Sequence, residues 1–477
     1  MKNIKLYIIG ALAICVTSCS KWLDVKPEDK FIEEEVYKSK QGFADGLNGI
    51  YLKLGASNMY GSQLTMETVD ILAKYYNISS IHSVERRNLV EYAYAQDDAK
   101  NKIDNIWTNF YLNILNINKF IENVDQYGNA VLDKEEHNVM RGEGLALRAY
   151  LYFDLLRLFA PAYHVDNESK LIPYYGKSSY EFAEFSTSKY IAERILEDLN
   201  TAEQLLAVSD PVINMVVVDR TMGSVDLGTK PYMVFRNYHM NYFAVKGLQA
   251  RVNLYLGNKA EALKAAETVI AAKSKFPWLS TTSSPFTDNK IFSTEILFAF
   301  ENPKRTSIYD NLFNPSQDDK SILAAGSNSN YLNKVFENWE NDYRYANQWI
   351  QSGGKTYRTF QKYKAPTYGN YQNTIAGLRL SEVFLIAAEC TNDQDKAIEY
   401  LNEIRRHRNC DVLGSGANIS LSIALEYRKE FYGEGQLWYF YKRTNASSIL
   451  SATTANEVNI NENDYTFPIP LSELDPR

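Results

Sequence analysis

The chain has 477 residues, of which 45% are hydrophobic and 23% charged, the ordinary composition of a globular protein with a sizeable core. Its formal net charge is −7 and no basic run is present, which argues against a nucleic acid ligand because phosphate binding requires a basic face. The chain is rich in aromatic residues, with 35 Tyr, 22 Phe and 6 Trp. Tyrosine combines a flat apolar face with a polar tip, which suits helix packing and the recognition of sugars or peptides.

The first nineteen residues have the layout of a lipoprotein signal peptide. Lys2 and Lys5 supply positive charge, residues 6–16 are apolar and uncharged, and small residues lead into Cys19. The apolar run is much shorter than the roughly 20 residues that a membrane-spanning helix needs. We therefore predict that residues 1–18 are removed and that Cys19 carries a lipid anchor. The alternative is an ordinary signal peptide whose cysteine is incidental.

Helical periodicity dominates the remainder of the chain. Apolar residues recur at steps of three and four, which places them on one face of a helix. Trp107 and Tyr111 follow this spacing and are predicted to belong to a core stripe. Gly142 and Gly144 are expected to permit close contact between helices. The strongest predicted helices are 103–124, 139–159, 187–206, 242–256, 260–272, 378–390, 396–407 and 420–432.

Two of these helices form a pair with a tetratricopeptide signature. Ala250 is followed by Gly257 at the expected turn and then by Ala262 and Ala266, small residues at positions where the helices of such a hairpin touch. A looser copy spans residues 387–404. One hairpin cannot bury its apolar faces alone, so we expect about four to stack into a superhelical array.

Two irregular stretches, 55–102 and 276–377, interrupt the helical pattern. Both are rich in Asn, Ser, Gly and Tyr, and long segments of this kind usually carry function. Short strands are predicted near 296–300 and 356–362. Rings in these stretches suit the apolar face of a sugar, and amides or a carboxylate suit its hydroxyls; burial in the core is the alternative for each ring. The candidate ligand contacts are Asp70, Tyr75, Tyr76, Asn77, Trp278, Tyr309, Asn311, Phe313, Asn314, Tyr331 and Trp349.

Only Cys390 and Cys410 remain to form a disulfide, because Cys15 leaves with the signal and Cys19 takes the lipid. In the predicted helix pair, Cys390 lies beside the turn and Cys410 lies at the far end. About fourteen helical residues at about 1.5 Å each separate them by roughly 20 Å. A disulfide requires less than about 7 Å between Cα atoms. We therefore predict two free thiols.

No constellation of residues indicates catalysis, a metal or a cofactor. The five histidines show no mutual spacing, and the chain has no His-Glu-x-x-His, no cysteine-rich metal motif and no Gly-x-Ser-x-Gly elbow. Residues 352–355 superficially suggest a phosphate-binding loop, but the spacing is wrong and a plain turn is predicted. Two carboxylates facing each other across a glycosidic bond cannot be recognised from sequence, so a glycosidase stays an alternative.

Seven short motifs occur in order along the chain. They consist of Cys19, Trp22, Leu23, Asp24 and Pro27; Trp107, Tyr111 and Asn118; Arg141, Glu143, Arg148, Ala149, Tyr150, Tyr152, Phe153, Asp154 and Leu155; Asp342 and Arg344; Arg379, Leu380, Glu382, Leu385, Ala388 and Glu389; Leu401, Asn402 and Arg405; and Phe467, Pro468, Ile469, Pro470, Glu473 and Leu474. Together they resemble the SusD/RagB family of Bacteroidetes outer-membrane lipoproteins over nearly all of the mature chain. One late helix departs from the family pattern, with Leu437 and Phe440 in place of Arg and Asp. This difference bears on the ligand more than on the fold.

The resemblance implies an all-α fold in which tetratricopeptide-like hairpins form a superhelix and long irregular segments form a ligand-binding layer. We expect one SusD-like domain over residues 19–477. Its helical scaffold is expected mainly at 103–275 and 378–443, and its ligand-binding segments at 55–102 and 276–377. The family motifs mark the scaffold, so the resemblance transfers no site residues.

The resemblance also implies a function. SusD-like proteins lie over a TonB-dependent SusC-type transporter in the outer membrane and capture nutrients, usually oligosaccharides and, in the RagB branch, peptides. We therefore expect a non-catalytic lipoprotein of the cell outer membrane, facing the extracellular side, that binds oligosaccharides and delivers them to the transporter without a cofactor. The alternatives are a peptide-binding subunit of the same kind of importer and a surface glycoside hydrolase.

Overall fold

A computed structural model describes residues 35–179, 181–218, 230–280, 287–326 and 329–474. The predicted signal peptide and Cys19 lie outside these residues. No helix within the described ranges is long and apolar enough to cross a membrane.

The α-helices of the described ranges are distributed along the whole chain, and the longest three lie in its first half. They are α3 (Lys40–Leu54), α4 (Thr68–Leu72), α5 (Val84–Val90), α6 (Asp97–Asn123), α7 (Asn129–Val131), α8 (Lys134–Phe159), α9 (Ser188–Ser209), α10 (Tyr242–Tyr255), α11 (Lys259–Ala271), α12 (Arg305–Leu312), α13 (Ser329–Val335), α14 (Tyr343–Gln348), α15 (Leu380–Cys390), α16 (Gln394–His407), α17 (Ile419–Glu430), α18 (Gln436–Arg443) and α19 (Leu471–Leu474).

The strands of the described ranges are short and form antiparallel pairs. The pairs are β1 (Lys170–Pro173) with β2 (Phe185–Thr187), β3 (Ile296–Glu301) with β6 (Thr374–Arg379), β4 (Trp349–Gln351) with β5 (Arg358–Phe360), and β7 (Ser448–Ser451) with β8 (Asn456–Asn459).

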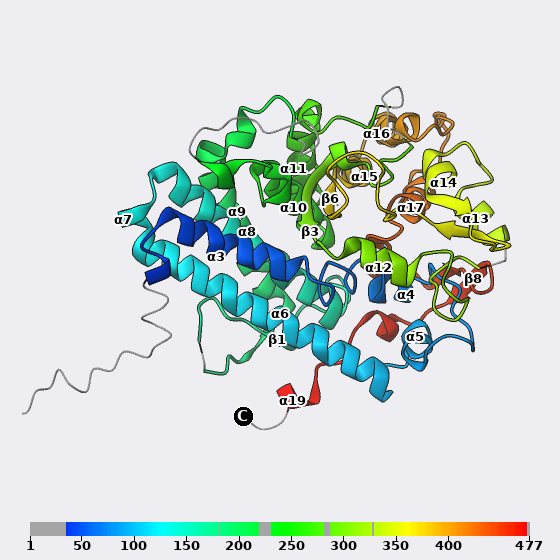
Figure 1. The fold of residues 1–477 in the computed structure, drawn as a ribbon, viewed down its shortest axis with the longest axis horizontal. Helices are drawn as coiled ribbons and strands as arrows, with labels where there is room; N and C mark the ends of the chain where they lie inside the picture. The colour runs from blue at the N-terminus through cyan, green and yellow to red at the C-terminus, as the bar shows by residue number, and fades with distance from the viewer. Residues whose placement is uncertain (1–34, 180, 219–229, 281–286, 327–328, 475–477) are drawn as a thin grey trace, which may run out of the picture.

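The long helices form the predicted scaffold of antiparallel hairpins. Helix α8 packs against α6 and α9, α10 against α11, and α15 against α16, and α11 joins the last two pairs. Figure 1 shows α6, α8 and α9 side by side, with α10 and α11 near the centre of the view and α15 and α16 towards its upper right. Every predicted helix is present, and the largest deviations are at the starts of α6 and α8, which begin at Asp97 and Lys134 rather than at the expected residues 103 and 139. The helix expected from residue 378 begins instead at Leu380, because residues 378 and 379 end strand β6.

Helix α8 lies at the centre of this scaffold. Asp133 and Glu136 form a reciprocal capping box at its start, which satisfies backbone N–H groups that have no partner inside the helix. Nearly every residue from Val139 to Phe159 is buried. A Cβ atom at Gly142 would lie 2.9 Å from Leu206 of α9, and one at Gly144 would lie 2.9 Å from Ile121 of α6. The predicted close helix contacts are therefore confirmed.

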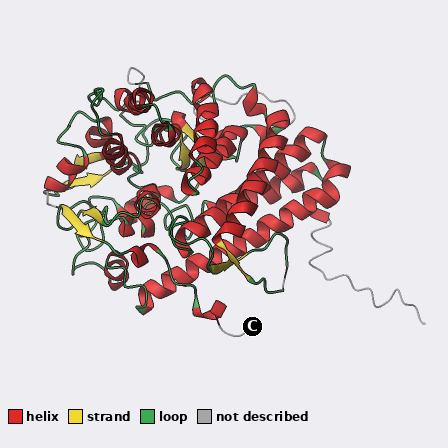
Figure 2. Cartoon of the chain, turned by 180° about the vertical axis from the view of Figure 1, so that it is seen from behind, coloured by secondary structure: helices red, strands yellow, loops and turns green. Residues whose placement is uncertain are grey.

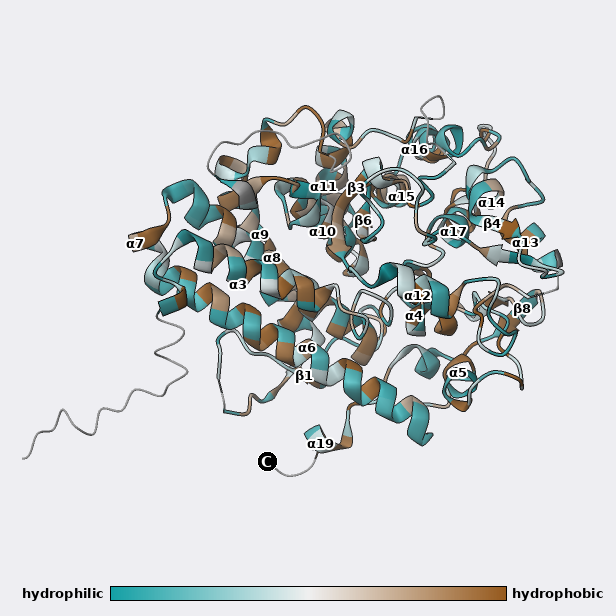
Figure 3. Ribbon diagram, viewed as in Figure 1, coloured by the Kyte–Doolittle hydropathy of each residue, from teal (hydrophilic) through white to brown (hydrophobic). Residues whose placement is uncertain are grey.

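Helix α6 lies at the edge of the scaffold. It is amphipathic along its whole length, with polar and apolar residues alternating around the ribbon (Figure 3). Its apolar side includes Trp107, which is buried against Phe159 as predicted, whereas the ring of Tyr111 is only partly buried.

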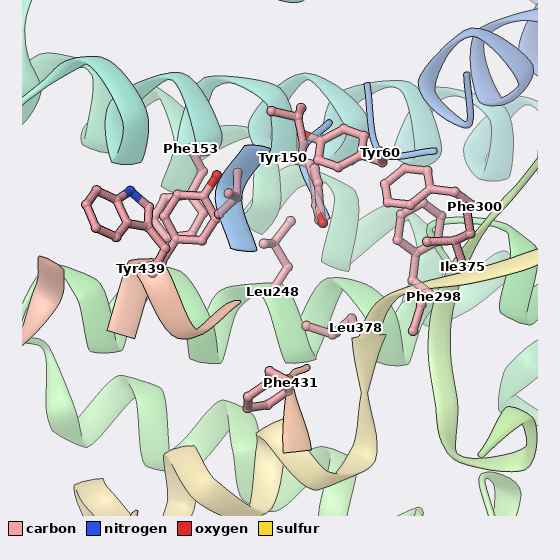
Figure 4. Close-up of a cluster of buried hydrophobic side chains, with 14 of the residues drawn as sticks. Tyr60, Tyr150, Phe153, Leu248, Phe298, Phe300, Ile375, Leu378, Phe431 and Tyr439 are labelled. Carbon is pink, nitrogen blue, oxygen red and sulfur yellow. The ribbon is translucent and has the colours of Figure 1, made fainter. Parts of the chain in front are cut away.

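Strands β3 and β6 cross the scaffold and contribute to its core. Tyr60 stacks on Phe300 of β3 with ring centroids 4.3 Å apart and planes 3° from parallel, and Tyr150 of α8 contacts both rings by its edge (Figure 4). At Gly377 of β6 a Cβ atom would lie 2.9 Å from the Phe298 ring. The aromatic rings of β3 can therefore pack against β6 only with glycine at this position.

The two irregular stretches form much of a second layer. Figures 1 and 2 show α3, α6, α8 and α9 side by side in one half of the molecule, and short helices, strands and loops beside α15 to α17 in the other. The predicted strands near 296–300 and 356–362 are confirmed as β3 and β5. The stretches are less irregular than expected, because they also contain α4, α5 and α12 to α14. These helices are too short to show a clear apolar period in the sequence.

A network of buried ion pairs joins the second layer to the scaffold. Arg344 of α14 pairs with Glu426 and Glu430 of α17 at 2.9 and 2.8 Å, and all three side chains lack exposed surface. Glu430 also pairs with Arg379 at the end of β6 and with Arg408 after α16. These arginines hold the pKa of Glu430 well below its ordinary value, although burial alone would raise it.

Candidate functional site

Most of the residues predicted to contact a ligand lie in the protein core. The structure does not support ligand contact by these residues, because a side chain with almost no exposed surface cannot touch a ligand. The buried candidates, each at most 4% exposed, are Asp70, Tyr75, Tyr76, Tyr309, Phe313, Tyr331 and Trp349.

Asp70 has a structural role in this fold. Its carboxylate accepts hydrogen bonds from the backbone N–H groups of Gly433 at 2.6 Å and Gly435 at 3.0 Å. Both glycines have positive φ, 81° and 73°, a conformation that other residues rarely adopt. Burial raises the pKa of Asp70, and the two backbone donors oppose that shift. Asp70 therefore fixes the turn between α17 and α18.

The buried rings do come together, as an internal aromatic cluster. We use this name for Tyr76, Phe313, Trp349, Phe360 and Tyr432. Trp349 meets Tyr432 edge to face at 4.7 Å and Phe360 at 5.0 Å, while Phe313 contacts both Phe360 and Tyr76. Aromatic residues of the two irregular stretches thus meet Tyr432 inside the protein, where they belong to the same hydrophobic core as the scaffold.

The remaining candidates are partly or fully exposed but dispersed. Trp278 lies on the scaffold, where its ring stacks on His407 at 4.8 Å and its indole N–H donates to Glu403 at 3.2 Å. Asn311 is exposed and Asn314 is half-buried, both at the end of α12. Asn77 lies where the two stretches meet, because its backbone N–H donates to the carbonyl of Ala324 at 2.8 Å.

The meeting of the two stretches at Asn77 leads to a group of polar residues of which the sequence predicted only Asn77. Arg86 of α5 donates to the Ser321 carbonyl at 2.6 Å. Asp319 accepts from Lys355 at 2.6 Å and from the Tyr357 hydroxyl at 2.7 Å. The group is named the loop face and consists of Asn77, Arg86, Asp319, Lys355 and Tyr357, together with the buried His82, whose charge would act on Asp319.

The electrostatics of the loop face favour one ionised carboxylate and one neutral imidazole. Hydrogen bonds from Lys355 and Tyr357 hold the pKa of Asp319 below its ordinary value, so the carboxylate is ionised at neutral pH. Burial and the nearby Arg86 lower the pKa of His82. Ile81 and Val84 add apolar surface beside these groups, with 56% and 50% of each side chain exposed.

The β4–β5 hairpin explains how Lys355 and Tyr357 reach Asp319. Residues 352–355 form the turn that the sequence predicted, with Gly353 and Gly354 at φ values of 63° and 75°. The turn brings Lys355 and the half-buried ring of Tyr357 against residues 317–319. The Gly-Gly turn between two short strands is the signal in the sequence that identifies this hairpin, but nothing local indicates its contact with Asp319.

Three of the hollows formed by the described residues lie elsewhere on the molecule. One, of about 310 Å³, is lined by Trp107, Tyr111, Tyr175 and Phe182 beside α6 and β1. A second, of about 510 Å³, lies between α3 and residues 232–239 and includes Tyr51 and His239. The third, of about 580 Å³, is lined by polar residues of α5, α6 and the loop after α3. Within the described ranges no group of three His, Cys, Asp or Glu is placed to hold a metal ion.

Comparison with known proteins shows where the chain belongs. A family model described as "starch-binding associating with outer membrane" matches residues 21–217, and the model of the SusD family matches residues 284–476. A SusD-like protein of Formosa agariphila is 23% identical over 93% of this chain and 92% of its own length.

Solved structures agree in fold. A SusD superfamily protein from Bacteroides thetaiotaomicron has a TM-score of 0.70 at 23% identity, covering 91% of this chain and 97% of that one. A laminarin binding SusD-like protein has a TM-score of 0.63 at 16% identity, covering 92% and 98%. The chain belongs to the SusD/RagB family, and its mostly helical fold with tetratricopeptide-like hairpins is the one expected. The first family description associates such proteins with the outer membrane.

Proposed function

We propose that this protein binds nutrient oligosaccharides at the loop face and delivers them to a TonB-dependent SusC-type transporter without altering them. The observation that carries this proposal is the junction of residues 77–86 with residues 319–324. Beside this junction, Tyr357 and Asp319 lie in direct contact on the surface. The similarity in fold to a laminarin binding SusD-like protein supports a glycan ligand.

The loop face has the groups that a sugar requires. The half-buried Tyr357 ring is held in place by the hydrogen bond from its hydroxyl to Asp319. The ring offers a flat surface to the C–H side of a sugar ring. Asp319 is 60% exposed in its side chain and can accept hydrogen bonds from sugar hydroxyls. A hydroxyl that loses water without gaining such a partner costs about 1–3 kcal/mol. The surface is open, so binding should be weak enough for release to a transporter.

The lipid anchor and the domain organisation complete the proposal. Acylated Cys19 would attach the mature chain to the outer membrane. Residues 19–477 would form one SusD-like domain, in which the helical scaffold supports the loop face. Affinity purification of the full lipidated chain from detergent-solubilised membranes should recover a TonB-dependent transporter. Recovery of the chain alone would contradict this partnership.

The identity of the ligand is tested by isothermal titration calorimetry on the soluble chain that lacks residues 1–19. Laminarin and starch oligosaccharides are the first probes, followed by a glycan array. Tyr357→Ala should weaken binding about tenfold, because the loss of one ring contact costs about 1.4 kcal/mol of binding free energy. Tyr368→Ala is the matched control, because that ring is 67% exposed outside the loop face. Binding of short peptides alone would favour the peptide-binding alternative, and new reducing ends would reveal a hydrolase.

A further inference from the structure

A row of amide side chains lines the polar hollow on the N-terminal half of α6. Asn101, Asn105 and Asn109 are spaced four residues apart, so they lie one above another on one face of the helix, about 6 Å apart along its axis. Asn58, in the loop after α3, faces this row and donates to the Asn109 side-chain oxygen at 2.7 Å. The hollow has a volume of about 580 Å³.

Amides at this spacing fit a linear polyhydroxylated ligand. Each side-chain amide can donate and accept hydrogen bonds, as each sugar hydroxyl can. The repeat along the helix is close to the length of one sugar unit in an extended glycan. Asn101 and Asn105 are exposed, whereas Asn109 is held by its bond to Asn58. The first two are therefore the amides most available to a ligand.

The hollow adjoins the loop face across helix α5. Glu85 of α5 lines the hollow. The next residue, Arg86, belongs to the loop face and donates to the Ser321 carbonyl. Figure 1 shows α5 beside the first turns of α6, at the margin of the second layer. One short helix thus separates the two surfaces, and an extended ligand can cross it.

The charges of the hollow favour a neutral ligand. Two carboxylates, Glu85 and Asp98, face one ammonium group, that of Lys102. Lys102 already pairs with Glu85 at 3.2 Å, which leaves the charge of Asp98 without a cation from the hollow. A glycan carrying carboxylate or sulfate groups would be repelled here.

We propose that this amide-lined hollow is a second subsite for the same ligand, which is a neutral, linear oligosaccharide long enough to span α5. This inference rests on the proposed function of the loop face. It adds that affinity increases with the length of the glycan chain and that acidic glycans are disfavoured.

The test compares long and short glycans on the soluble chain that lacks residues 1–19. Titration calorimetry uses laminarin-derived and starch-derived disaccharides and octasaccharides, with an oligogalacturonate of matched length as the acidic probe. The double variant Asn101→Ala/Asn105→Ala should bind the octasaccharide about three- to tenfold more weakly, the value of one or two ordinary hydrogen bonds. Its affinity for the disaccharide and its melting temperature should match the wild type.

Asn116→Ala is the matched control, since Asn116 lies farther along α6, outside the hollow, and bonds to the Leu112 carbonyl. Wild-type affinity of the double variant for octasaccharides would overturn the second subsite while leaving the proposed function intact. Tighter binding of oligogalacturonate than of neutral octasaccharides would overturn the neutral class. Absence of wild-type binding to any neutral oligosaccharide, on the array as well, would overturn both proposals.

Discussion

Arg344 and Glu430 form an ion pair of 2.8 Å in which neither side chain has exposed surface. Arg344 belongs to the second irregular stretch and Glu430 to helix α17 of the scaffold, so this pair joins the two layers. Glu430 also accepts from Arg379 and Arg408, which brings the end of β6 and the end of α16 to the same carboxylate. The second layer is therefore attached to the scaffold by charges as well as by apolar contacts.

Replacing Arg344 should destabilise the whole protein. Arg344→Met leaves Asp342, Glu426 and Glu430 buried with one cation fewer, and removal of one partner from a buried pair costs about 3–5 kcal/mol. Urea denaturation followed by circular dichroism measures the change. Arg406→Ala is the control, because its pair with Glu399 is exposed and is worth at most about 1 kcal/mol. Equal losses in both variants would show that burial of the pair is unimportant.

Stability should fall in acid because of the same network. Burial alone would raise the pKa of Glu426, but Lys429, Arg344 and Arg405 lower it from 4.5 to about 2. A folded-state pKa below the unfolded value means that the contribution is complete above pH 4.5 and is lost as the pH falls towards 2. The loss from this group should be about 3 kcal/mol. Urea midpoints at successive pH values measure it, and Glu426→Gln should flatten the profile in that window.

Trp349→Ala should destabilise the second layer rather than remove a contact with a ligand. The ring is fully buried between Phe360 and Tyr432, so its removal should cost about 3–5 kcal/mol. The melting temperature should therefore drop, whereas Tyr357→Ala should leave it nearly unchanged. A Trp349→Ala protein with wild-type stability and lost glycan affinity would restore the interpretation of Trp349 as a ligand contact.

The two thiols should be unreactive in the folded protein. Both are free, as predicted, with Cys390 buried and Cys410 partly buried, and burial raises the pKa of each to about 12. Little thiolate is then present at pH 8, and the thiolate is the reactive form. Alkylation by iodoacetamide, followed by mass spectrometry, should label both residues in urea and neither in buffer. Rapid labelling in buffer would indicate that one end of the α15–α16 pair opens.

Cys19 should carry the membrane anchor. The residue lies outside the described part of the chain, so this prediction rests on the signal-like residues before it. Cys19→Ala should leave the protein unprocessed or release it from the membrane fraction. Mass spectrometry of the mature N-terminus should find an acylated cysteine, and an unmodified N-terminus at another residue would contradict the assignment.

The sequence by itself determined the helical scaffold. Residues 139–159 and 242–272 were predicted within a few residues of α8, α10 and α11, and the small residues Gly142 and Ala262 lie where helices touch. The period of an amphipathic helix is a local property, so it can be recognised in the sequence without knowledge of the element that the helix packs against. The separation of the two cysteines followed from the same helix geometry.

Only the tertiary structure decided which residues of the irregular stretches face solvent. Trp349 and Tyr357 lie on one short hairpin in similar sequence surroundings, yet the first is fully buried and the second reaches Asp319 at the surface. Burial in such a segment depends on which distant segment packs over it, here Tyr432 and the turn that Asp70 holds. The first contact joins residues 83 positions apart and the second joins residues 363 positions apart, so no local pattern of hydrophobicity indicates them.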